Sequence, residues 1–69
     1  MNLKDEFGEI EIKLKTGEKI VVIADLYRSN WLTNVFVAGY EYFDVDAEKK
    51  VTEITFYCKL NNLLYFRDL

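Results

Sequence analysis

Residues Glu9–Lys15 alternate strictly between polar and apolar, so that one side of an extended chain is charged and the other is aliphatic. A period of two is typical of a β-strand with one buried face. Thr16-Gly17 follows as a turn signal, because glycine adopts a positive φ at little steric cost. The apolar run Lys19–Ala24 comes next, and we therefore predict an antiparallel hairpin over residues 9–23.

The length of the loop decides which residues face each other across this hairpin. A two-residue loop, Thr16-Gly17, would place Leu14 opposite Lys19 and mix apolar with charged groups on one face. A three-residue loop over residues 16–18 places Leu14 opposite Ile20, and we predict this register. The usual form of such a loop has its glycine third, whereas Gly17 would stand second here.

The second strand of the hairpin differs from the first, because it is apolar on both faces. Val21 and Ile23 point to the side where the first strand offers only Glu11 and Lys13. Something must cover that side. Either the strand bends from one sheet into the next, as in small barrels, or another subunit packs there.

Asp25–Asn34 has no clear period and leaves two interpretations open. A short helix fits its apolar residues only loosely. Arg28-Ser29-Asn30 fits a turn between a continued second strand and a new strand that begins near Trp31, because Ser and Asn favour turns. We predict the turn.

Three further strands are predicted in the second half of the chain. Val35–Phe43 is rich in β-branched and aromatic residues, and Gly39 within it indicates a bulge or a sharp bend. Val51–Leu60 alternates again, and Leu63–Arg67 forms a last short strand after the turn signal Asn61-Asn62. The residues of the fourth strand that we predict to point inward are Ile54, Phe56, Cys58 and Leu60.

Composition narrows the range of functions. The 69 residues suffice for one small domain, residues 1–69, whose core is marginal at this size. Cys58 is the lone cysteine and histidine is absent, which excludes an intramolecular disulfide and the usual zinc sites; we predict no metal and no cofactor. The charged segment at residues 4–6 is unlike a signal peptide, no apolar run could span a membrane, and we expect the protein in the cytoplasm.

The predicted fold is all-β, a five-stranded antiparallel and strongly bent sheet or a small SH3-like barrel. Residues 2–8 fit either one helical turn or an extended segment that leads into the first strand. The possible helical turn at Leu3–Phe7, the hairpin residues Ile12–Ile20 and the close at Leu60–Leu63 together resemble the Sm-like version of these barrels.

The resemblance implies an RNA-binding barrel. Sm-like proteins usually carry an Asp and Asn pair after the second strand and a second Asn motif, led by glycine, before the last strand. Asn34 stands near the place of the first Asn, whereas Lys59-Leu60 replaces the glycine-containing lead. RNA binding therefore does not transfer from the resemblance alone, and we keep binding of single-stranded RNA as the alternative function.

Two features of the sequence are candidates for metal binding or catalysis, and neither has the full set of residues that the chemistry needs. Asp44, Asp46 and Glu48 have the spacing of a calcium loop, but Lys49 stands where the loop needs glycine, and the closing glutamate is missing. Cys58 has no histidine to activate it and lies on the inward phase of its strand. We therefore predict that the protein is not an enzyme.

Aromatic residues beside cations are the remaining candidates for a binding surface. Tyr57 and Lys59 are both predicted to point outward from their strand. Tyr65 and Arg67 share one face of the last strand. Such pairs occur in protein interfaces and in surfaces that stack single-stranded nucleic acid. The net charge of −3 favours a protein partner or self-association. The predicted partner-binding residues are Arg28, Asn30, Trp31, Tyr57, Tyr65 and Arg67. A small regulator or inhibitor encoded by a phage or other mobile element would fit this size and acidity.

Overall fold

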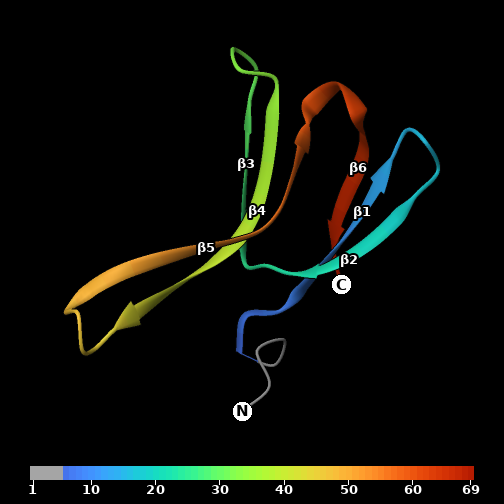
Figure 1. Ribbon diagram of the computed structural model, residues 1–69. Coiled ribbons are helices and arrows are strands. Elements are labelled where there is room, and N and C mark those ends of the chain that lie inside the picture. Colours follow the sequence, from blue (N-terminus) through green and yellow to red (C-terminus); the bar gives the residue numbers. More distant parts are fainter. Residues whose placement is uncertain (1–5) are drawn as a thin grey trace.

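The computed structural model describes residues 6–69, which form six β-strands and one 3₁₀ turn (Figure 1). The strands make two three-stranded antiparallel sheets, ordered β2-β1-β6 and β3-β4-β5. The all-β prediction is thus confirmed. In chain order the elements are β1 (Glu9–Leu14), β2 (Lys19–Ile23), β3 (Leu26–Asn30), β4 (Val35–Asp44), β5 (Lys49–Lys59), η1 (Leu60–Asn62) and β6 (Leu63–Asp68).

The described chain has six strands where five were predicted, because the expected second strand is interrupted at Ala24-Asp25. The amide of Ala24 donates to the carbonyl of Gly8 at 3.2 Å, just before β1. The next amide, that of Asp25, donates to the carbonyl of Gly39 in β4 at 2.9 Å. The chain therefore leaves one sheet and joins the other at this point. The two sheets remain separate three-stranded ladders and do not close into a barrel, so the structure has neither the single five-stranded sheet nor the small barrel that was predicted.

The loop between β1 and β2 lies one residue earlier than predicted. Leu14 pairs with Glu18, whose carbonyl accepts the Leu14 amide at 2.9 Å, and the loop consists of residues 15–17. Gly17 is therefore third in the loop, where its φ of 99° is the left-handed conformation that glycine favours. Ile12 consequently faces Ile20, and the predicted register is wrong by two residues. A shift of two keeps each side chain on its predicted face.

The second face of β2 is covered only in part. Ile23 is half-buried, and its carbonyl accepts a hydrogen bond from Thr55 Oγ1 of β5 at 2.8 Å. Val21 is 50% exposed and lies opposite Glu11. The bend of the chain into the second sheet thus shields Ile23 and leaves Val21 partly open to solvent.

The predicted turn at Arg28-Ser29-Asn30 is wrong, since these residues lie in β3 and pair with β4. The turn comes next, at residues 31–34. It forms there because Asn30 Oδ1 accepts the backbone amides of Leu32 and Thr33 at 3.0 and 3.2 Å. Asn34 closes the turn with a positive φ of 58°, a conformation that asparagine tolerates.

The core lies between the two sheets. Phe66 of β6 joins them, because its ring centroid lies 4.9 Å from that of Phe36 and 4.5 Å from that of Tyr27. Full burial of a side chain such as Phe36 contributes about 1.5–3 kcal/mol. Phe56, Cys58 and Leu60 pack against this core as predicted. The buried apolar residues are Ile10, Ile12, Ala24, Phe36 and Ala38.

Gly39 marks the predicted bend in β4. Ala38 faces Phe56, but Gly39 faces Ile54, so that Thr55 is an extra residue in the β4–β5 ladder. A Cβ atom at Gly39 would collide with the backbone of β5, which makes glycine necessary. The extra residue reverses the side to which β5 directs its side chains. Ile54 is therefore 51% exposed, and its predicted inward position is wrong.

Beyond Gly39, β4 and β5 continue alone as a two-stranded arm, residues 40–53, that projects from the body formed by the other described residues (Figure 1). The projection gives the molecule extents of 41 × 27 × 13 Å. An isolated two-stranded hairpin is marginally stable in water. At the base of the arm Phe7 stacks on Tyr40 with ring centroids 4.5 Å apart. The choice between a helical turn and an extended segment at residues 2–8 falls largely outside the described residues.

Candidate interaction surface

The pairing of β3, β4 and β5 gathers four of the predicted binding residues on one surface. Phe36 and Ala38 of β4 point into the core, so the alternate residues of this sheet point away from it. Arg28, Val37 and Tyr57 form one row across this outer face, and Asn30, Val35 and Lys59 form the next.

The turn that follows β3 forms an exposed tip at the end of this sheet. Trp31 is 84% exposed and Leu32 is 97% exposed. We call the tip and the two rows beside it the tip-and-face surface. It comprises Arg28, Asn30, Trp31, Leu32, Val35, Val37, Tyr57 and Lys59.

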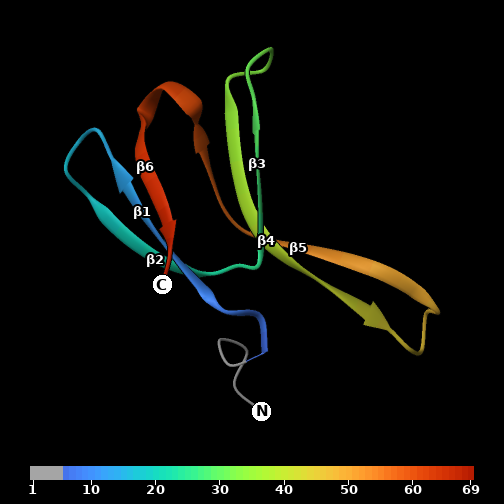
Figure 2. The same ribbon diagram turned by 180° about the vertical axis from the view of Figure 1, so that it is seen from behind.

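Hydrogen bonds fix the tip to the body. The carbonyl of Asn34 accepts the Leu60 amide at 2.9 Å, and Asn34 Oδ1 accepts the Asn61 amide at 3.1 Å. The carbonyl of Asn62 in turn accepts the Lys15 amide at 2.9 Å. Three loops are thus joined at one end of the molecule (Figure 2). The two apolar side chains of the tip stand on a backbone that these contacts hold in place.

The tip-and-face surface is cationic, although the whole chain carries a net charge of −3. Residues 26–40 and 54–67, which supply the surface, contain no Asp and no Glu. Arg28 and Lys59 are exposed in the two rows that also hold Tyr57, and the exposed Trp31 follows in the turn. The surface therefore combines apolar anchors with positive charge.

Tyr65 and Arg67, the other two predicted binding residues, lie on the second sheet and contact Glu11 of β1. Arg67 Nε donates to Glu11 Oε2 at 2.9 Å, and the Tyr65 hydroxyl donates to the same oxygen at 3.1 Å. Lys19 Nζ lies 3.9 Å from Glu11 Oε1. The hydrogen bond from Arg67 is the main cause that lowers the pKa of the Glu11 carboxyl, while burial opposes it. The sequence showed Glu11 only as an outward residue, because nothing in it pairs β1 with β6.

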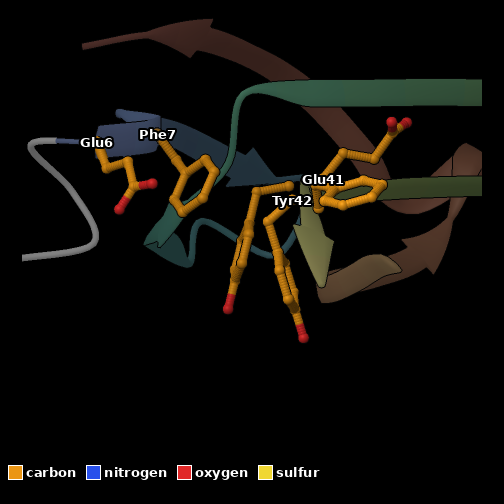
Figure 3. A pocket seen from close by; sticks show the side chains of 6 residues that line it. Glu6, Phe7, Glu41 and Tyr42 are labelled. Atoms are coloured by element: carbon orange, nitrogen blue, oxygen red, sulfur yellow. The ribbon is translucent and has the colours of Figure 1, made fainter. Parts of the chain in front are cut away.

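A hollow of about 470 Å³ lies at the base of the arm (Figure 3). The rings of Tyr40 and Tyr42 line it side by side, with centroids 6.2 Å apart. Burial raises the pKa of the Tyr42 hydroxyl, and the nearby carboxylates of Glu53 and Asp44 raise it further. The hollow is thus aromatic and negatively polarised. The residues that line it are Glu6, Phe7, Tyr40, Glu41, Tyr42 and Phe43.

Cys58 and Asp44, two residues with potential for covalent or metal chemistry, make contacts that stabilise the fold. Cys58 is half-buried against the core, and burial raises the pKa of its thiol. Asp44 Oδ1 accepts the backbone amides of Asp46 and Ala47. Residues 6–69 contain no group of three or more Cys, Asp or Glu side chains placed to hold a metal ion. In the part of the chain that the structure describes, no helix has the length and apolar character needed to cross a bilayer.

Comparison of the chain with protein-family models, with curated proteins and with solved structures finds no match. A function is therefore inferred from the surfaces described above.

Proposed function

We propose that this chain is a non-enzymatic interaction module of the cytoplasm that binds a protein partner through the tip-and-face surface. The observation that carries the proposal is the turn at residues 31–34. Trp31 and Leu32 are exposed there on a backbone held by hydrogen bonds from both the turn itself and η1. A rigid backbone reduces the conformational entropy that binding removes.

The residue types of this surface support a protein partner. Trp, Tyr and Arg are the side chains that most often dominate binding energy in protein interfaces. Arg28 and Tyr57 lie in one row here, and Trp31 lies in the turn that follows β3. A suitable partner would present an apolar pocket for Trp31 and Leu32. Carboxylates around that pocket would face Arg28 and Lys59 and would orient the complex.

The test is capture followed by direct measurement. Proteins retained from a host lysate by the immobilised chain are purified, and their affinity for the wild type and for the variant Trp31→Ala/Leu32→Ala is measured by calorimetry. We expect the variant to bind at least about 30-fold more weakly, because one interface hot spot contributes about 2 kcal/mol.

Leu64→Ala/Leu69→Ala is the matched control for this experiment. It truncates two exposed apolar side chains that lie outside both the tip-and-face surface and the arm, and we expect wild-type affinity. A purified partner that binds the tip variant as tightly as the wild type would contradict the proposal.

Single-stranded nucleic acid is a second candidate, because the tip-and-face surface joins two cations to two aromatic rings and lacks carboxylates. Such surfaces stack bases and attract phosphates. Trp31 is the one tryptophan of the chain, so its fluorescence reports on the surface directly. Quenching by a single-stranded RNA oligonucleotide that weakens as salt rises would support this function. Absence of quenching, or quenching that salt leaves unchanged, would exclude it.

A further inference from the structure

We infer that the tip-and-face surface of one copy binds the arm of a second copy. The inference rests on the proposed function, since it takes the tip-and-face surface as a binding surface, and it names a partner for it. The two regions have opposite charge, both expose apolar side chains, and they lie on different sides of the molecule.

The arm carries charge opposite to that of the tip-and-face surface. Residues 40–53 include five carboxylates and two lysines, so that their net charge of −3 equals that of the whole chain. One of the lysines, Lys50, lies 3.8 Å from Glu41, an exposed pair that offsets little of this charge. Asp46 and Glu48, in the turn at the end of the arm, are exposed. The arm therefore offers the carboxylates that Arg28 and Lys59 would face.

Both regions also expose apolar side chains. Phe43 is 60% exposed near the end of the arm, and Val45 in its turn is more exposed still. Contact of these residues with Trp31 and Leu32 would remove apolar area from water on both sides. Opposite charges would then set the orientation of the complex, while the apolar contact would supply most of its affinity.

A single molecule cannot bring the two regions together. The arm leaves the body at Gly39, and both views show its end well away from the β3–β4 turn, on a different side of the body (Figures 1 and 2). The complementarity can therefore be satisfied only between molecules.

A contact between different surfaces of identical molecules leaves one of each surface free after every addition. Assembly should consequently continue beyond a dimer as concentration rises, or should close into a ring. Because the charged groups are exposed, added salt should weaken it.

Two charge-reversed variants test the inference by sedimentation velocity. The arm variant is Asp46→Lys/Glu48→Lys, and the face variant is Arg28→Glu/Lys59→Glu. For the wild type we expect a mean mass that rises with concentration at low salt and falls when salt is added. Each variant alone should remain monomeric, and an equimolar mixture should recover assembly, because the reversed arm of one then matches the reversed face of the other.

The control variant Asp25→Lys/Asp68→Lys changes the net charge as much as the arm variant does, at exposed positions of the body. It should assemble like the wild type. A wild type that is monomeric at every concentration and at low salt would overturn the inference without any variant. A mixture that stays monomeric, or an arm variant that assembles like the wild type, would overturn it as well. These outcomes leave the binding of a foreign partner, and hence the proposed function, to its own test.

Discussion

Two turns of this molecule share one backbone design. Asn30 in the β3–β4 turn accepts the amides two and three residues later at 3.0 and 3.2 Å. Asp44 in the β4–β5 turn accepts the corresponding amides at 3.1 and 3.2 Å. Each turn closes on a residue with positive φ, 58° at Asn34 and 54° at Glu48. The same local chemistry thus builds both turns.

The surroundings and side chains of the two turns differ. The first turn is joined to η1 through Asn34 and displays Trp31 and Leu32. The second ends an arm in which only β4 and β5 pair, and it displays carboxylates. Local hydrogen bonds therefore shape a turn, whereas its contacts with the rest of the chain decide whether it belongs to the body or to a projecting arm.

The largest difference in stability between body and arm should come from replacing one aromatic residue in each. Phe36→Ala removes a fully buried ring and should lower the free energy of unfolding by about 3–5 kcal/mol. Phe43→Ala removes an exposed ring of the arm and should lower it by less than about 0.5 kcal/mol. Equilibrium unfolding in urea, followed by circular dichroism, measures both. Equal losses would show that the arm belongs to the cooperative core.

Gly39, where body and arm meet, should tolerate substitution poorly. Gly39→Ala places a methyl group against the backbone of β5, and we expect a loss of about 2–3 kcal/mol in the same urea experiment. Gly17→Ala is the control, because its space is open and only its positive φ resists the change, at about 1 kcal/mol. If the two variants were equally stable, the close approach at Gly39 would not be what requires glycine.

The residues that close the two turns should respond to glycine with opposite signs. Glu48→Gly relieves a left-handed conformation that glutamate disfavours and should raise stability by about 0.5–1 kcal/mol. Asn34→Gly keeps the conformation but removes the hydrogen bond to Asn61, and should lower stability by about 1 kcal/mol. Urea unfolding of both variants decides this. A loss at Glu48 as large as that at Asn34 would contradict the distinction between an anchored and a free turn.

The pH dependence of stability distinguishes Glu11, which pairs within the body, from the carboxylates of the arm turn, which face solvent. Its pKa in the folded protein is lowered from the ordinary value of 4.5, so its contribution to stability is present above that pH and lost as pH falls. Glu11→Gln should therefore flatten the acid side of the curve of unfolding free energy against pH. Arg67→Gln removes the main cause of the shift and should flatten it too. An unchanged slope in Glu11→Gln would show that other groups set the acid response.

Much of the strand content followed from the sequence, because alternation and glycine act locally. The period of two over Glu9–Lys15 and the glycine at position 39, within Val35–Phe43, correctly indicated a strand and a bend. The loop of the first hairpin is also local, since the preference for glycine in third place matches the observed loop at residues 15–17. The register predicted by pairing apolar residues across the hairpin was wrong. The predicted and observed registers differ by two residues, which leaves every side chain on the same face, so burial cannot distinguish them.

The predicted binding residues could be recognised by residue type, but their grouping in space could not be predicted from neighbouring residues. The residue types of four candidates, Arg28, Asn30, Trp31 and Tyr57, could be recognised in the sequence. Their position on one sheet depends on the pairing of β3 with β4, and the sequence predicted a turn where β3 lies. Tyr65 and Arg67 matched the same description and lie on the other sheet.

The amino-acid sequence by itself determined that the chain is β-rich, that it bends at a glycine, and that five of its twelve Asp and Glu residues lie between residues 41 and 53. Only the tertiary structure decided that Ala24-Asp25 divides one strand between two sheets and that Ile54 turns outward. It also decided that the cationic and acidic regions lie apart. The physical reason is that side-chain alternation and turn preference are properties of neighbouring residues, whereas the pairing of strands and the placement of charge depend on contacts between residues far apart in the chain.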